Sequence, residues 1–152
     1  MKTESNVYPQ PLLVTKFNET EKCVLITDMD SIVEETTEEG TIYKYQQYEM
    51  FTQAPIEYIT EKANELLEKL KTKEYNDLAE KIREKRNALL DESDKYMALD
   101  RVGLDTSSAI AFLASLKNIF ANNYAKYRQS LRDITKQPNF PYEVTWPEKP
   151  KE

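Results

Sequence analysis

Alternation of apolar and polar residues in the first third of the chain predicts β-strands. A period of two places successive side chains on opposite faces of a sheet. The runs with strand composition are residues 12–17, 22–29 and 41–51. A turn at 18–21 would join the first two runs, and the acidic segment 28–40 is either a loop or contains a further strand at 31–35. The pattern predicts a small antiparallel sheet, preceded by a loosely held polar arm at 1–11.

Beyond Ala54 apolar residues recur every three or four positions, which is typical of amphipathic helices. Pro55 is suited to the first helical position, where its missing N–H is not needed. The first apolar stripe comprises Ile56, Ile59, Ala63, Leu66 and Leu70, and the second comprises Tyr75, Leu78, Ile82 and Leu89. The five-residue step from Leu70 to Tyr75 rotates the stripe by roughly 140° at about 100° per residue. A continuous bent helix would fit, but we favour two helices with a break near 72–74.

After a connector at 91–105, the most regular stripe predicts a third helix over 106–134. Its apolar positions are Ile110, Leu113, Phe120, Tyr124, Tyr127, Leu131 and Ile134. Asp105 or Thr106 could cap its first turn. The helix would be about 43 Å long at 1.5 Å per residue, which exceeds what the core of a small domain requires. Its excess length must therefore lie on another helix of the chain, on a second copy or on a partner.

Prolines end the helical pattern and shape the last segment. Pro138 pushes Gln137 out of the helical region, and residues 142–146 can form a short strand. Trp146 is too large and apolar to be left in water without a reason. We expect it to fold back onto the third helix or onto the connector around Tyr96.

These elements predict an α+β fold. A small N-terminal antiparallel β-sheet is followed by a helical module of two or three helices with an extended tail that contains prolines and Trp146. The expected division is a β-rich region at 1–53 and a helical region at 54–152.

Composition narrows the range of partners. The chain has 152 residues with 21 Lys and Arg against 27 Asp and Glu, so its net charge is −6. Phosphate backbones need clustered positive charge, and a protein partner fits better than a nucleic acid. No apolar run approaches the roughly 20 residues of a membrane span, and the first ten residues lack the apolar segment of a signal peptide. A single cysteine indicates a reducing compartment, so we expect a soluble protein in a cytoplasm.

Catalytic and metal-binding patterns are nearly absent from the sequence. The chain has no histidine and only two glycines, which removes the commonest general base and excludes glycine-rich phosphate loops. Cys23 lies in an apolar run and is interpreted as a small buried hydrophobic residue. Asp28 and Asp30 weakly resemble the start of a calcium loop, but the glycine and the ligands between Asp30 and Glu39 are missing. The sequence predicts neither an enzyme nor a bound cofactor or metal.

Tyrosines suggest a candidate partner surface. The chain has ten, and three lie in the run 41–51. Alternation puts Tyr43, Tyr45 and Phe51 on one face of the strand and Tyr48 on the other. Packing within the sheet is the favoured explanation. The alternative is a protein-binding surface formed by Tyr43, Tyr45, Tyr48 and Phe51, because tyrosine is enriched at interfaces.

Arg128 and Arg132 lie four residues apart on one face of the third helix, where like charges repel, so each should have an acceptor. Asp94 and Asp100 in the connector are candidates, and Asp133 could act locally through Gln129. We expect these arginines to anchor the connector to the helix.

A family resemblance emerges at the C-terminal end. The residues that carry it are Leu89, Leu90, Ser93, Asp94, Tyr127, Arg128, Gln129, Leu131, Arg132, Asp133, Trp146 and Pro147. This pattern resembles the phage tail assembly chaperone family, which includes tail fibre assembly proteins. Many relatives have tryptophan after the Ser-Asp pair, where this chain has Lys95 and Tyr96. The resemblance covers about the last 70 residues and leaves the sheet region unassigned.

The resemblance implies a non-catalytic phage or prophage assembly chaperone that binds a tail or tail-fibre protein in the bacterial host cytoplasm. It implies no catalytic residues. The helical module would form a homo-oligomer seam, and the sheet would contact the client. The alternative is a minor structural or adaptor protein that is retained in the phage tail.

Overall fold

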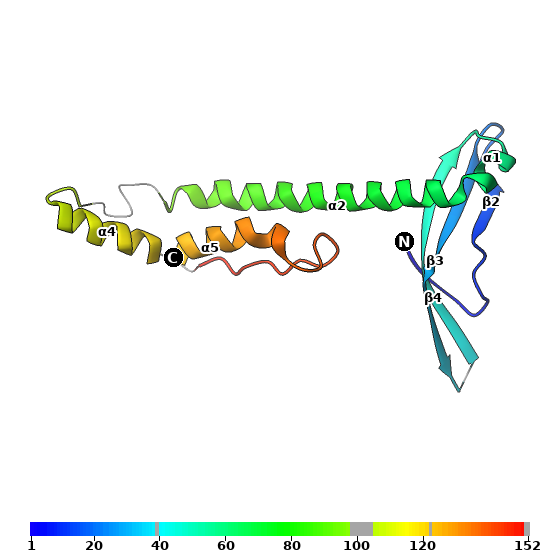
Figure 1. Cartoon of the computed structure of the whole chain (residues 1–152), viewed down its shortest axis with the longest axis horizontal. Coiled ribbons are helices and arrows are strands. Elements are labelled where there is room, and N and C mark those ends of the chain that lie inside the picture. Colours follow the sequence, from blue (N-terminus) through cyan, green and yellow to red (C-terminus); the bar gives the residue numbers. More distant parts are fainter. Residues whose placement is uncertain (39, 98–104, 122, 151–152) are drawn as a thin grey trace. The chain divides into compact units, whose positions relative to one another are not determined.

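The computed structural model describes residues 1–38, 40–97, 105–121 and 123–150 (Figure 1). The chain divides into two compact units, Met1–Glu74 and Tyr75–Glu152. The first unit contains a four-stranded antiparallel sheet and the second is helical, which confirms the predicted α+β class. The expected boundary between residues 53 and 54 stays a prediction.

The strands are β1 (Lys2–Ser5), β2 (Leu12–Lys16), β3 (Lys22–Thr37) and β4 (Gly40–Thr52). Their order in the sheet is β1-β4-β3-β2, with every neighbouring pair antiparallel. The further strand expected at 31–35 exists as the end of β3, beyond an irregularity between Asp28 and Val33. The expectation of a loose N-terminal arm was wrong, because residues 2–5 pair with β4 from Lys2 opposite Gln46 to Ser5 opposite Tyr43. Polar side chains did not prevent this, since strand pairing uses main-chain groups.

The core of the first unit lies on one face of the sheet. Helix α1 (Ile56–Glu61) and the first turns of helix α2 (Ala63–Asp94) cover it. Val24, Ile26 and Ile59 are its buried centre. The residues that pack around this centre are Leu12, Val14, Met50, Ala54, Leu66, Leu67 and Leu70.

Helix α2 is continuous over 32 residues, so the predicted break near 72–74 was wrong. The interruption falls at Lys62 instead, between α1 and α2. The apolar stripe shifts because the helix packs on different elements along its length. Leu66 and Leu70 contact the core of the first unit, whereas Ile82 and Leu89 contact the aromatic cluster of the second. The apolar stripe of a continuous helix can therefore rotate where its packing partner changes, without any break in the helix.

The predicted single helix over 106–134 was also wrong. The described residues form α4 (Ala109–Ala121), α5 (Asn123–Arg132) and the 3-10 helix η1 (Asp133–Lys136). Ser108 caps the first turn of α4, because its Oγ accepts from the Ala111 N–H at 3.1 Å. Asp105 does not cap the helix, since its Oδ1 accepts from the Ser107 N–H within the preceding turn.

Burial divides the third stripe into two parts. Tyr124, Tyr127, Leu131 and Ile134 are buried, while Ile110 is 83% exposed and Leu113 is 65% exposed. The apolar positions in α5 and η1 therefore have packing partners, whereas the first apolar positions of α4 face solvent. The helical pattern ends before Pro138 as predicted, with Gln137 extended at φ −65° and ψ 142°.

Candidate functional site

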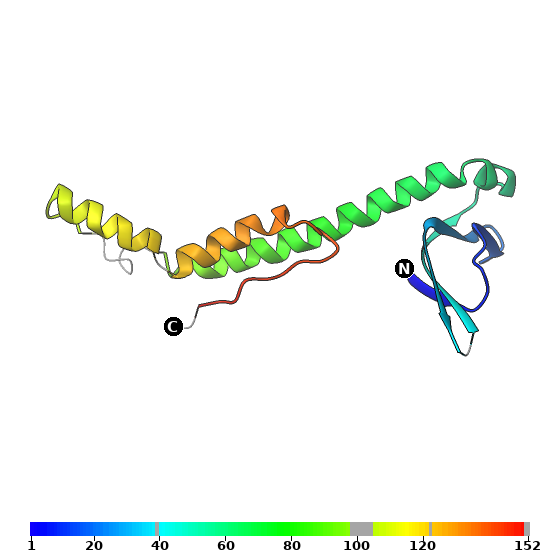
Figure 2. The same cartoon turned by 60° about the horizontal axis from the view of Figure 1, so that its bottom comes forward.

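The second unit is built around a cluster of buried residues from α5 and η1. Tyr124, Tyr127, Leu131 and Ile134 form its centre. Side chains that pack against them come from α2, from the segment after it and from the tail: Ile82, Leu89, Leu90, Tyr96, Met97, Phe140, Val144 and Trp146. Figure 2 shows α5 lying beside the C-terminal half of α2, with the tail running back along them. We call residues 75–97 and 123–150 together the C-terminal clasp.

Arg128 joins α5 to the end of α2. Its Nη1 donates to the carbonyl oxygen of Leu90 and to the hydroxyl of Ser93, both at 2.6 Å. The same nitrogen lies 2.5 Å from Oδ1 of Asp94. A guanidinium suits this position because it offers several donors in a fixed plane. It also places a positive charge at the helix C-terminus, where carbonyl groups lack intrahelical partners. Of the two candidate acceptors that the connector offered to Arg128 and Arg132, Asp94 is confirmed as a partner of Arg128, and Asp100 lies outside the described residues.

Arg132 behaves differently from Arg128. It is exposed, and its side chain makes no hydrogen bond or ion pair with another described residue. The anchor to Asp94 is therefore made by Arg128 and not by Arg132, while Asp100, the other candidate in the connector, lies outside the described residues. Asp133 instead pairs with Lys136 at 2.6 Å and accepts from Gln129 at 2.9 Å. Both contacts lower the pKa of the Asp133 carboxyl.

Tyr96 and the last described residues close one end of the clasp. The rings of Tyr96 and Tyr124 are stacked, with centroids 4.1 Å apart. The Tyr124 hydroxyl donates to the carbonyl oxygen of Pro150 at 3.1 Å. Lys149 Nζ lies 2.5 Å from Glu92 Oε1, and this hydrogen bond lowers the pKa of Glu92. The tail is thus fastened to both α2 and α5.

Trp146 folds back as predicted, although it does not become fully buried. It packs against the cluster of the clasp and remains half-buried, with Lys85 Nζ 4.5 Å from the centre of its ring. The tail before it is extended but forms no strand in the described residues, so the strand predicted at 142–146 was wrong. The main-chain groups of Thr145 bond to a side chain instead of a neighbouring strand. The Gln137 side chain donates to the Thr145 carbonyl oxygen and accepts from the Thr145 N–H, both at 2.8 Å.

The residues of the predicted family pattern thus gather in the clasp. Leu89, Leu90 and Trp146 pack against the buried cluster, to which Tyr127 and Leu131 belong. Ser93 and Asp94 bind Arg128, and Pro147 is partly buried beside Trp146. Burial raises the pKa of the Tyr127 hydroxyl, and Glu92 adds to this effect. Most of the pattern residues are occupied in holding this unit together, which leaves few of their side chains for a partner. The Gln137–Thr145 and Glu92–Lys149 contacts were not predicted, since no spacing rule relates positions on a helix to positions in an irregular tail.

The first unit has the more open apolar surface. One face of its sheet is covered by α1 and α2, and the opposite face, which we call the outer sheet face, carries Leu13, Phe17 and Phe51. Their exposed fractions are 49%, 61% and 49%. The rings of Phe17 and Phe51 meet edge to face with centroids 4.7 Å apart. Leu13 and Phe17 were not among the predicted surface residues. The sequence does not show how β2, β3 and β4 are ordered in the sheet, and therefore does not show that these side chains share a face with Phe51.

The predicted tyrosine surface is brought together only in part. Tyr43 and Tyr45 are partly buried on the outer side of β4, and Tyr43 contacts the ring of Tyr8 at a centroid distance of 5.3 Å. Tyr48 is only 7% exposed and lies on the opposite face. Its side chain is not available to a partner in this structure. The partner role of Tyr43, Tyr45 and Phe51 stays a prediction.

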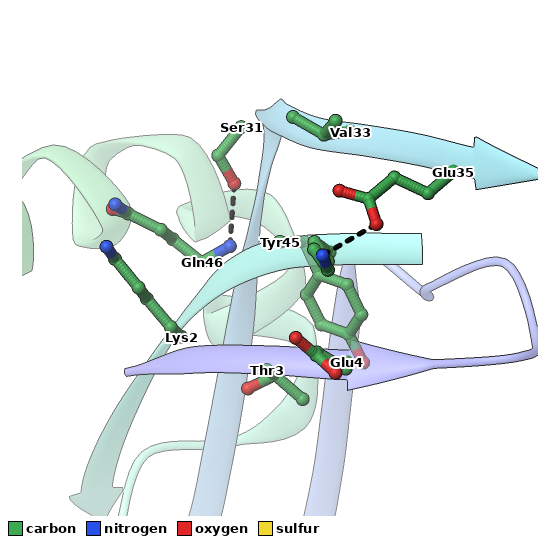
Figure 3. A pocket seen from close by; sticks show the side chains of 9 residues that line it. Lys2, Thr3, Glu4, Ser31, Val33, Glu35, Tyr45 and Gln46 are labelled. Atoms are coloured by element: carbon green, nitrogen blue, oxygen red, sulfur yellow. Dashed lines mark hydrogen bonds and ion pairs between the residues drawn. The ribbon is translucent and has the colours of Figure 1, made fainter. Parts of the chain in front are cut away.

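A hollow of about 330 Å³ lies where β1, β3 and β4 meet at the irregularity of β3 (Figure 3). Its lining includes Lys2, Glu4, Glu35 and Lys44, with Lys44 and Glu35 paired at 2.6 Å. The Ser31 hydroxyl accepts from the Gln46 N–H at 2.7 Å and donates to the Asp28 carbonyl oxygen at 2.6 Å. These contacts bridge the irregular part of the strand. The Ser31 hydroxyl is thereby engaged by main-chain groups, and the Glu35 carboxylate by Lys44.

Two other sequence candidates have structural partners. Cys23 is half-buried, and its thiol lies 3.3 Å from Glu49 Oε1. Burial and the carboxylate raise the pKa of the Cys23 thiol, which opposes formation of a reactive thiolate. Asp28, from the weak calcium pattern, belongs to β3 and pairs with Lys71 at 2.8 Å. Among the residues that the structure describes, no group of three or more potential ligands could hold a metal ion.

The fold and these surfaces define a class of protein: an α+β chain with a helical clasp and an open apolar sheet face. Residues 79–151 match the family described as phage tail assembly chaperone protein. This match confirms the family resemblance on the segment that forms most of the clasp. It does not extend to the sheet.

Comparison with curated proteins and with solved structures gave no match. In the described part of the chain, none of the helices has the length and apolar character needed to cross a membrane.

Proposed function

We propose that this protein is a non-catalytic assembly chaperone that binds a phage tail or tail-fibre protein during morphogenesis in the bacterial host cytoplasm. The observation that carries the proposal is the family match over 79–151. A phage or prophage origin follows from the same family. In this proposal no small molecule, cofactor or metal takes part, and the net charge of −6 disfavours nucleic acid as the partner.

The two units suggest a division of work. Most family-pattern side chains in the clasp are engaged in internal contacts, so we assign the clasp a structural role. The outer sheet face exposes Leu13 and, further along β2, the contacting rings of Phe17 and Phe51. Exposed apolar groups of this kind mark protein contacts more often than scattered surface residues do. We therefore assign client contact to the outer sheet face.

Coexpression with a candidate client tests this assignment. The candidate is the tail or tail-fibre protein whose gene neighbours that of the chaperone. We expect soluble client in the presence of the wild-type protein and at least a severalfold loss with the Phe17→Ser/Phe51→Ser variant. The matched control is Tyr142→Ser, which changes an exposed aromatic residue in the clasp that is 57% exposed. Equal client solubility with all three proteins would exclude the outer sheet face as the contact.

The alternative function is a minor structural or adaptor protein that stays in the phage tail. The same family match is compatible with it, and particle composition separates the two. Mass spectrometry of purified phage should find little or none of a chaperone that is released after assembly. A stoichiometric amount in mature tails would favour the structural role.

A further inference from the structure

Strand β2 leaves one edge of the sheet open. It is the last strand in the order β1-β4-β3-β2, and it pairs only with β3 among the described strands. The Thr27 N–H donates to the Pro11 carbonyl oxygen at 3.0 Å, and the Phe17 N–H donates to the Glu21 carbonyl oxygen at 3.0 Å. In an antiparallel ladder, main-chain groups alternate between the two sides of a strand. Because residues 11 and 17 bond toward β3, the N–H and C=O groups of residues 12, 14 and 16 point away from it.

Apolar side chains at this edge are incompletely covered. Leu12 and Val14 pack against the core of the first unit, yet both remain partly exposed. The opposite edge of the sheet is less suited to pairing, because β1 has only four residues and two of them, Lys2 and Glu4, are charged. Charged residues and short length are common protections of an edge strand. In β2 only Lys16 offers such protection.

We propose that β2 pairs antiparallel with β2 of a second copy of this chain, with Val14 opposite Val14 of the second copy. In this register Leu12 lies opposite Lys16 of the second copy, and the reverse holds by two-fold symmetry. Every outward-pointing main-chain group of Leu12, Val14 and Lys16 then faces a complementary group. The proposal does not depend on the proposed function.

Charge and packing support the second copy as the occupant. The register keeps the two Lys16 residues at opposite ends of the new pair, roughly 14 Å apart at about 3.4 Å per residue. No like charges therefore face each other within the paired strands. Leu12 and Val14 of both copies become neighbours, so the two apolar cores continue across the junction. The two outer sheet faces also join into one larger surface.

Cross-linking tests the register. Leu13 and Thr15 bond toward β3, so Leu13 of one copy should face Thr15 of the other in a non-hydrogen-bonded pair with Cα atoms about 4.5 Å apart. That spacing allows a disulfide. In a Cys23→Ser background, the double variant Leu13→Cys/Thr15→Cys should give a covalent dimer on mild oxidation. Leu13→Cys alone and Thr15→Cys alone should give at least tenfold less.

A second experiment measures dimer formation after substitutions in the edge strand β2. Lys16→Pro removes an outward N–H without removing a bond to β3, because proline is tolerated at a free edge. Lys16→Thr is the matched control, since it removes the charge and keeps the N–H. Sedimentation should show a dimer for the wild type and Lys16→Thr at micromolar concentration, and at least tenfold weaker association for Lys16→Pro. Circular dichroism verifies that all three proteins are folded.

Three results would overturn the proposal. One is a wild-type monomer throughout the micromolar range. Another is a dimer that Lys16→Pro leaves unchanged, because association would then use another surface such as α4. The third is equal cross-linking of the single and double cysteine variants, which would indicate random collision.

Discussion

Arg128 of α5 binds the Leu90 carbonyl oxygen near the C-terminus of α2, with 2.6 Å between Nη1 and the oxygen. The two residues are 38 positions apart in the chain. This bond and the neighbouring one to Ser93 are largely shielded from water, since Ser93 is 1% exposed. The arginine is therefore the main polar connection between α2 and α5 in the described part of the chain.

Arg128→Ala should destabilise the clasp by about 3 kcal/mol, because it leaves buried acceptors without a charged donor. The ion pair between Arg128 and Asp94 contributes little to stability, since the Asp94 carboxylate is mostly exposed. Chemical denaturation measures the loss. The matched control is Arg132→Ala, four residues along the same helix, for which we expect a change within about 0.5 kcal/mol. Equal losses for the two variants would contradict the role assigned to Arg128.

Trp146→Ala should cost about 2 kcal/mol, less than the roughly 3–5 kcal/mol expected for a fully buried tryptophan, because this ring is only half-buried. Trp146→Phe should recover part of the loss because it keeps an aromatic ring on the cluster. Thermal or denaturant unfolding measures both. A loss well under about 1 kcal/mol for Trp146→Ala would mean that the tail does not hold the clasp closed.

The Glu92–Lys149 pair predicts a pH dependence of stability. Lys149 lowers the pKa of Glu92, so this contribution is present above the unfolded pKa of about 4.3 and is lost as the pH falls through the lower folded pKa. Glu92 raises the pKa of Lys149, so that contribution is lost only as the pH rises beyond about 10.4.

Glu92→Gln is the variant that tests this pair. It should lower the melting temperature slightly at about pH 7 and by less at about pH 3, because protonation of the Glu92 carboxylate at low pH removes its attraction to Lys149. Both side chains are well exposed, so the effect is small. A difference between variant and wild type that is the same at both pH values would assign the effect to something other than this pair.

Lys73→Pro tests the continuity of α2. Lys73 is exposed and lies inside the helix, at the place where the sequence predicted a break. Proline there removes a helical hydrogen bond and clashes with the preceding turn, so we expect a loss of about 3 kcal/mol. Lys73→Ala should change stability by no more than about 0.5 kcal/mol. Tolerance of the proline would support two separate helices.

Local patterns were sufficient for the class of the fold. Alternation located β2, the first half of β3 and most of β4, and helical spacing located α1, α2 and α5 approximately. The residues around Arg128, Trp146 and Pro147 also carried the family resemblance that the match over 79–151 confirms. These features are short-range in sequence, or depend on strings of neighbouring residues, and each can be recognised without knowing which elements meet.

Long-range contacts decided the rest. The step from Leu70 to Tyr75 looked like a break, but it records two packing partners along one continuous helix. Pairing with β4 turned a polar arm into β1, because main-chain hydrogen bonds do not require apolar side chains. The sequence by itself determined most of the strands and helices, and the resemblance to a family over residues 79–151. Only the tertiary structure decided which side chains close the clasp and which face of the sheet stays open, because both depend on the meeting of distant segments.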